Sequence, residues 1–103
     1  MAGEYPTVTM NIKRRWFADI LAQPCRHPLE YREIKPFWDR RLAGLIGSRF
    51  KLRLLNGMLR PVPEATIMVE KLVRNSRNGE WELHLGRVLE VKHWNRKSER
   101  PLR

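Results

Sequence analysis

The chain has 103 residues, enough for one domain of about 100–150 residues, and its 42% hydrophobic content is typical of a folded protein. It carries 21 Lys and Arg against 11 Asp and Glu, and this net charge of +10 predicts a polyanionic partner, nucleic acid before an anionic membrane surface. The longest run without a charged residue, Tyr5–Ile12, has eight residues, which excludes a transmembrane helix of about 20 apolar residues.

The first half of the chain predicts two strands and two helices. Residues 1–6 are expected to form a loose arm, and residues 7–13 alternate apolar and polar side chains like a half-buried strand. Helical spacing follows in residues 14–22, whose apolar stripe is Trp16, Phe17, Ile20 and Leu21. After a loop at residues 23–28, residues 29–34 alternate again. A second helix begins at Lys35-Pro36 and its stripe runs to Ile46, before Gly47.

The second half predicts strands only. Residues 50–55 and 65–73 have strand composition, and residues 75–79 (NSRNG) are typical of a hairpin turn. The last strand or pair of strands covers residues 81–94, with a bend or bulge expected at Gly86. The order β-α-β-α-β-β-β predicts an α+β fold, a small mixed β-barrel flanked by two short helices. We expect one domain over residues 7–94 and a basic, disordered tail over residues 95–103.

Several segments together resemble the ASCH domain, a relative of the PUA domains. The resemblance covers roughly residues 8–92 and is carried by segments in the same order as in a phage and bacterial branch of that family. These segments are WFADILA (16–22), LEYREIKPFW (29–38), Arg41-Leu42, Leu55-Asn56-Gly57 and LHLGRVLE (83–90). The resemblance implies a PUA-like barrel with a cleft between the first helix and the barrel, in which RNA or a modified nucleoside is bound.

The chain departs from the family at the cleft. A Gly-x-Lys segment of the family is replaced by residues 23–28, QPCRHP, which are about two residues longer. Three residues before Glu30 stands His27, so the family's lysine is missing unless Arg26 replaces it. One branch of the family hydrolyses acetylated cytidine with a lysine, a threonine and a glutamate; its threonine position falls on Glu30. That catalytic set is therefore absent.

Glu30 and Arg32 match the Glu-x-Arg of the family, and two residues apart on a strand they share a face. Together they are suited to bind a base edge or an exocyclic amine; the alternative is a structural salt bridge across the barrel. Glu30 and His27 are also the candidate acid and base if the protein is an enzyme. His27 lies in a loop that we expect to be mobile, so we predict that it contributes little.

Basic residues are concentrated between residues 13 and 60, where 12 Lys and Arg face 4 Asp and Glu. Lys13, Arg14 and Arg15 oppose the dipole of the helix that they begin, which suggests phosphate binding rather than helix stabilisation; a solvated cluster is the alternative. Trp38 is a candidate for stacking on a base; the alternative is that it packs in the core. The further candidates for nucleic-acid contact are Arg26, Lys35, Arg40, Arg41, Lys51 and Arg53. Trp16 and Trp81 are expected in the core.

A single cysteine, Cys25, excludes an internal disulfide and fits a reducing compartment. Since no basic start precedes an apolar stretch, we expect no secretory signal and a cytoplasmic protein. Cys25 and His27 have only His84 and His93 as possible co-ligands, without metal-site spacing, so we expect no metal and no cofactor.

The sequence therefore predicts a nucleic-acid-binding module, for RNA before DNA, without a membrane partner. A hydrolase acting on RNA or a modified nucleoside is the alternative. An interaction protein that modulates a host complex is the third possibility.

Overall fold

The computed structural model describes residues 4–102. Its elements follow the expected order: β1 (Thr7–Asn11), α1 (Arg14–Leu21), β2 (Leu29–Glu33), α2 (Pro36–Leu42), β3 (Phe50–Leu55), β4 (Glu64–Asn75) and β5 (Glu80–Lys92). A short hairpin of β6 (Trp94–Asn95) and β7 (Arg100–Pro101) follows. Residues 4–6 precede β1 without regular secondary structure, and the rest of the expected N-terminal arm lies outside the described residues.

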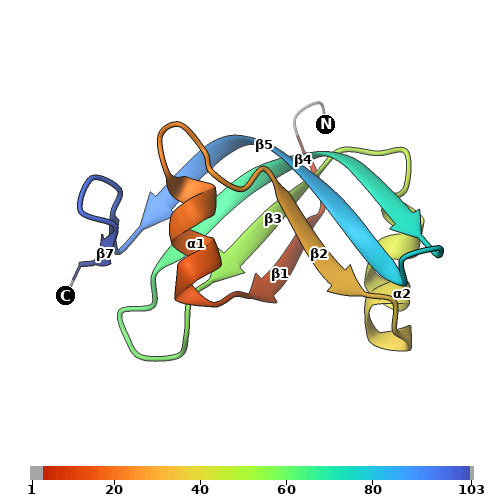
Figure 1. Ribbon diagram of the computed structural model, residues 1–103, viewed down its shortest axis with the longest axis horizontal. Coiled ribbons are helices and arrows are strands. Elements are labelled where there is room, and N and C mark those ends of the chain that lie inside the picture. The colour runs from red at the N-terminus through yellow and green to blue at the C-terminus, as the bar shows by residue number, and fades with distance from the viewer. Residues whose placement is uncertain (1–3, 103) are drawn as a thin grey trace.

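Five strands form one mixed sheet in the order β1-β3-β4-β5-β2. β1 runs parallel to β3, and the other neighbours are antiparallel. The sheet curls into a half-barrel, with α1 and α2 at opposite ends of it (Figure 1). The α+β class and the two short helices are confirmed. Within residues 4–102 the sheet does not close through backbone pairing, because β1 and β2 each have a strand neighbour on one side only.

The alternating pattern of β3 shows how the sequence builds the core. Phe50, Leu52 and Leu54 are fully buried, whereas Lys51 and Arg53 between them are partly exposed on the outer face. From α1, the spacing of Phe17, Ile20 and Leu21 brings three buried side chains into the same cluster. Burial of such side chains supplies most of the free energy that holds a helix of eight residues in place.

Strands β4 and β5 are long and bend through irregular pairing. Ile67 pairs with Val88 and Val69 with Leu85, so two residues of β5 stand opposite one of β4 at Gly86. This confirms the bulge predicted there, which increases the twist that curls the sheet.

The second helix is shorter than predicted. α2 ends at Leu42, and the chain continues in a 3-10 turn, Ala43–Leu45, before Gly47 with a φ of 85°. Asp39 in α2 accepts hydrogen bonds from Arg74 of β4 and from the indole of Trp81 of β5. These bonds attach α2 to the end of the long β4–β5 hairpin.

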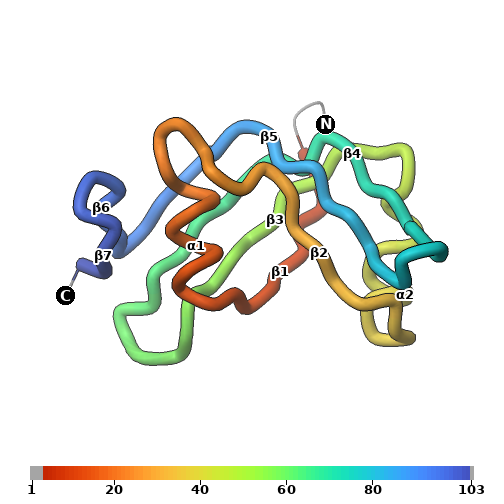
Figure 2. Tube along the Cα trace, viewed as in Figure 1, coloured from red at the N-terminus to blue at the C-terminus, as the bar shows by residue number. Residues whose placement is uncertain are grey.

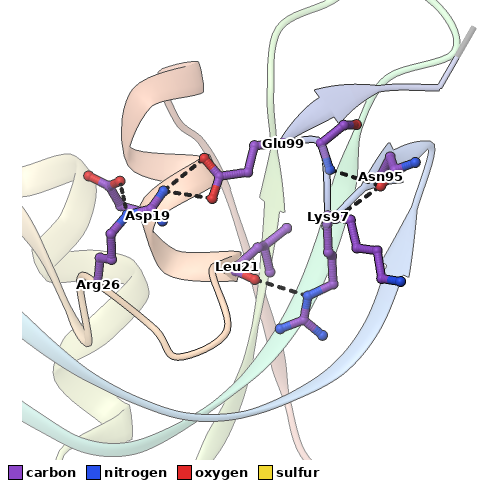
Figure 3. Close-up of polar contacts among 8 residues, drawn as sticks. Asp19, Leu21, Arg26, Asn95, Lys97 and Glu99 are labelled. Carbon is purple, nitrogen blue, oxygen red and sulfur yellow. Dashed lines mark hydrogen bonds and ion pairs between the residues drawn. The ribbon is translucent and has the colours of Figure 1, made fainter.

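The segment after β5 differs from the disordered tail that its composition predicts. Arg96 donates through Nε to the carbonyl of Leu21 at 3.0 Å, and Arg26 Nη2 lies 2.9 Å from Glu99 (Figure 3). The β6–β7 hairpin is thus attached to the C-terminal end of α1. Figure 2 shows the hairpin at the same end of the molecule as that helix. The last residue of the chain lies outside the described part.

Candidate functional site

A pocket of about 530 Å³ opens where the two edge strands of the half-barrel approach α1. Volumes of about 300–1,000 Å³ are usual for sites that hold small molecules or parts of larger ones. The lining residues come from β1, the start of α1, the loop before β2, and β2 itself: they are Asn11, Ile12, Lys13, Trp16, His27, Glu30, Tyr31 and Arg32. The pocket therefore lies between the first helix and the sheet.

Glu30 and Arg32 form an ion pair on the pocket wall. Glu30 is only 5% exposed, and its Oε2 accepts a hydrogen bond of 2.7 Å from Arg32 Nη1. Its Oε1 accepts one from the backbone N–H of Tyr31 at 3.1 Å. Because the two side chains stand two residues apart on β2, they share a face as predicted. A carboxylate buried to this degree is tolerated because both of its oxygens have partners.

Arg32 also bridges the two edges of the sheet. Besides Glu30, its guanidinium donates to the carbonyl of Tyr31 at 2.9 Å and to the carbonyl of Asn11 on β1 at 2.8 Å. The side chain thereby supplies a link between β2 and β1 that backbone pairing does not provide. Arginine has five N–H donors, and these bonds use three, so two remain for a ligand as far as the described residues are concerned.

Aromatic rings form the other wall. The rings of Trp16 and His27 lie 4.8 Å apart with an interplanar angle of 33°, and Tyr31 follows at 6.5 Å from His27. The guanidinium of Arg15 lies over the Trp16 ring at 5.0 Å. Trp16 is 36% exposed, so its expected place in the core is wrong, whereas Trp81 is fully buried as predicted. His27 is half-buried against these rings and lines the pocket, so the structure places it in the candidate site although the sequence predicts that it contributes little.

The cations that begin α1 take different positions. Lys13 lines the pocket. Arg14 donates to the side-chain oxygen of Asn56 at 3.1 Å, and the amide of Asn56 donates to the carbonyl of Ile12 at 3.0 Å. Asn56 is buried and so fixes the junction between β1 and α1 to the end of β3. The helix start is therefore held beside the pocket even though three cations oppose its dipole.

The other predicted contact residues lie outside the pocket. Arg26 is bound to Asp19 and Glu99, whose hydrogen bonds raise the pKa of its guanidinium. The remaining residues of this set are Lys35, paired with Glu33; Trp38, packed against the core; Arg40 and Arg41 on α2; and Lys51 and Arg53 on the outer face of β3. α2 lies at the far end of the sheet from α1 (Figure 1), so Arg40 and Arg41 are carried at a different end of the sheet from Lys13, Arg14 and Arg15.

Two ion pairs outside the pocket, one of them at the predicted position Arg53, shift the pKa of their carboxylates. Arg53 binds both carboxylate oxygens of Glu64 at 2.9 Å, and this hydrogen bonding lowers the pKa of Glu64. Arg74 binds Asp39 in the same forked way, and its hydrogen bond is the main cause of the lowered pKa of Asp39. Both pairs connect elements of the fold and are not part of the pocket.

The sequence did not identify Trp16 and Tyr31 as pocket residues. Trp16 lies at the border of a stripe whose buried members are Phe17, Ile20 and Leu21, and Tyr31 occupies the outward position between Glu30 and Arg32. The one available signal was that a large aromatic residue stands inside the Glu-x-Arg segment and another follows the cationic helix start.

Cys25 is exposed, and among residues 4–102 no three His, Cys, Asp or Glu side chains are close enough together to hold a metal ion. Within the same residues, no helix has the length and apolar content required to span a bilayer. Comparison of the chain with protein-family models, curated proteins and solved structures finds no match.

Proposed function

We propose that the protein binds single-stranded nucleic acid, RNA in preference to DNA, by holding an unpaired base in the pocket. The observation that carries this proposal is the composition of one pocket. Aromatic rings of Trp16, His27 and Tyr31 line it together with Lys13 and the Glu30–Arg32 pair. Aromatic side chains stack on unpaired bases, cations bind the backbone, and an ordered polar pair recognises base edges.

RNA is preferred because its loops and bulges present unpaired bases, whereas bases in duplex DNA are stacked and paired. The net charge of +10 favours any such polyanion. The resemblance to ASCH domains supports the same function, and we propose that the half-barrel is a PUA-like fold whose Glu-x-Arg segment faces the ligand.

Binding is favoured over hydrolysis because the carboxylate of Glu30 is held in one orientation and the candidate replacement for the family's lysine lies elsewhere. Both oxygens of Glu30 accept hydrogen bonds from within β2, which suits a group that recognises a base edge. The candidate replacement for the family's lysine, Arg26, is bound to Asp19 and Glu99 and does not line the pocket.

The test is a titration of fluorescein-labelled octanucleotides of A, C and U followed by fluorescence anisotropy. Trp16→Ala is expected to weaken binding about 5- to 150-fold, because a stacked base contributes about 1–3 kcal/mol. Phe37→Ala is the matched control, since Phe37 is also an exposed aromatic residue but lies on α2. Equal effects of the two variants, or no binding by the wild type, would refute the proposal.

Salt dependence gives a second readout. For a single strand, the slope of log K against log salt concentration is about −0.7 for each phosphate contact. Lys13→Gln is expected to reduce that slope by about 0.7, and Lys71→Gln, on β4, is expected to leave it unchanged. A slope near zero for the wild type would exclude a polyanionic ligand.

A further inference from the structure

The pocket continues into a second groove. A neighbouring hollow of about 380 Å³ is lined by Asn11, Ile12 and Lys13, all of which also line the first pocket, and by Asn56 and Gly57. The two hollows therefore meet at Lys13, and the second one extends toward the loop between β3 and β4. A groove of this shape offers room beside the proposed base site, not within it.

The loop between β3 and β4 continues from Gly57, which lines the second groove, to two exposed apolar side chains. Met58 is 90% exposed and Leu59 is 70% exposed. The base of the loop is fixed, since the N–H of Asn56 donates to the carbonyl of Pro63 at 2.9 Å. In Figure 2 the loop lies near the start of α1, to which Asn56 at its base is bound through Arg14.

The surroundings of these two side chains are cationic. Arg60 follows them in the loop and is exposed, and Arg14 is hydrogen-bonded to Asn56 at the base of the loop. Among the residues that line either hollow, the one acid is Glu30 of the first pocket, and its charge is balanced by the ion pair with Arg32. An apolar tip beside a cationic groove matches the chemistry of a nucleotide, whose base has an apolar face and whose phosphate is an anion.

We infer that the second groove binds the nucleotide next to the one in the pocket, with its base against Met58 and Leu59 and the intervening phosphate at Lys13. This inference rests on the proposed function and narrows it: the ligand is a strand of two or more nucleotides, not a free nucleoside or mononucleotide. Covering these aliphatic side chains with the face of a base removes apolar surface from water, a contribution that depends little on which base is present.

The experiment compares a strand with its own mononucleotide. The probe is whichever of the A, C and U octamers the wild type binds most tightly, and the matching nucleoside 5′-monophosphate is titrated by NMR. The variant Met58→Ser with Leu59→Ser is expected to bind the octamer about 5- to 150-fold more weakly, because it loses the apolar burial against the second base, and to bind the mononucleotide as the wild type does. Ile46→Ser is the control, because Ile46 is an exposed apolar residue after α2.

The outcomes separate the two proposals. If Trp16→Ala weakens octamer binding but the loop variant does not, the second groove is refuted and the base pocket stands. If the wild type binds neither probe, both proposals fail.

An anionic lipid surface is the other chemistry that suits an apolar tip among cations. It is tested by sedimentation with vesicles of phosphatidylserine and phosphatidylcholine. Vesicle binding that Met58 and Leu59 support, with octamer affinity unchanged in the loop variant, would overturn the inference in favour of a membrane.

Discussion

Replacing Arg32 with alanine tests whether this side chain holds the open edges of the half-barrel together. The guanidinium makes three hydrogen bonds, to Glu30, to the carbonyl of Tyr31 and to the carbonyl of Asn11 on the opposite edge strand. Alanine removes all three and leaves the buried Glu30 carboxylate with one partner, the N–H of Tyr31.

The expected loss follows from these bonds. A hydrogen bond to a charged partner contributes about 1.5–3 kcal/mol and one to a backbone carbonyl about 0.5–1.5 kcal/mol. The side chain of Arg32 is 19% exposed, so water reaches part of the vacated space and reduces the cost. We expect the free energy of unfolding to fall by about 3 kcal/mol, which lowers Tm by roughly 12–24 °C in a domain of this size.

The measurement is thermal and urea unfolding followed by far-UV circular dichroism. Arg41→Ala is the control, since Arg41 is exposed and makes one bond, to the carbonyl of Phe37, and it is expected to cost less than about 1 kcal/mol. Adding Glu30→Gln to Arg32→Ala removes the unpaired buried charge and is expected to recover about 1–2 kcal/mol. A Tm within about 3 °C of the wild type for Arg32→Ala, or no recovery in the double variant, would refute the bridging role.

Three further outcomes are expected. Hydrogen bonds from Arg74 and Arg53 lower the pKa of Asp39 and Glu64 in the folded state below their ordinary values of 3.8 and 4.5, so the unfolded chain binds protons at a higher pH than the folded chain does. Tm should therefore fall as the pH drops from about 5 to 3, and the fall should be weaker when Arg53 and Arg74 are both replaced by glutamine. Gly79→Ala should lower stability by about 1–2 kcal/mol in urea unfolding because φ is +72° there, whereas Gly44→Ala, at an ordinary φ with open space around it, should not. Chromatography of acetylated cytidine incubated with the protein should show no deacetylation; turnover that Glu30→Gln abolishes would establish a hydrolase.

The elements were predictable from the sequence because their residues carry a strong periodic signal. In β3, buried apolar residues alternate with partly exposed residues along the whole strand. In α1, Phe17, Ile20 and Leu21 lie on one side of the helix. The residue at which α2 ends was not predictable. Leu45 and Ile46 continue the apolar spacing of the helix, although the backbone there has already tightened into a 3-10 turn. Local spacing reports which side chains can share a face, not where a helix stops.

The site was partly predictable. Glu30 and Arg32 share a face by strand alternation, and the structure places both on the pocket. The parallel pairing of β1 with β3 is what brings Lys13 and the start of α1 to the same place, and no local pattern encodes that pairing. The ion pair of Arg26 with Glu99 could not be predicted for the same reason, because Glu99 lies 73 residues away in the chain.

The β6–β7 hairpin has a consequence for the order in which the protein folds. Its bonds to the end of α1 and to the loop after that helix join residues 75 and 73 positions apart, Arg96 with Leu21 and Glu99 with Arg26. Its Trp94 is buried and packs edge-on against Phe17 of α1. Closing loops of that length costs chain entropy, and these contacts repay it only once the sheet has brought both segments together. The hairpin therefore docks late in folding, and its docking completes the core beside α1.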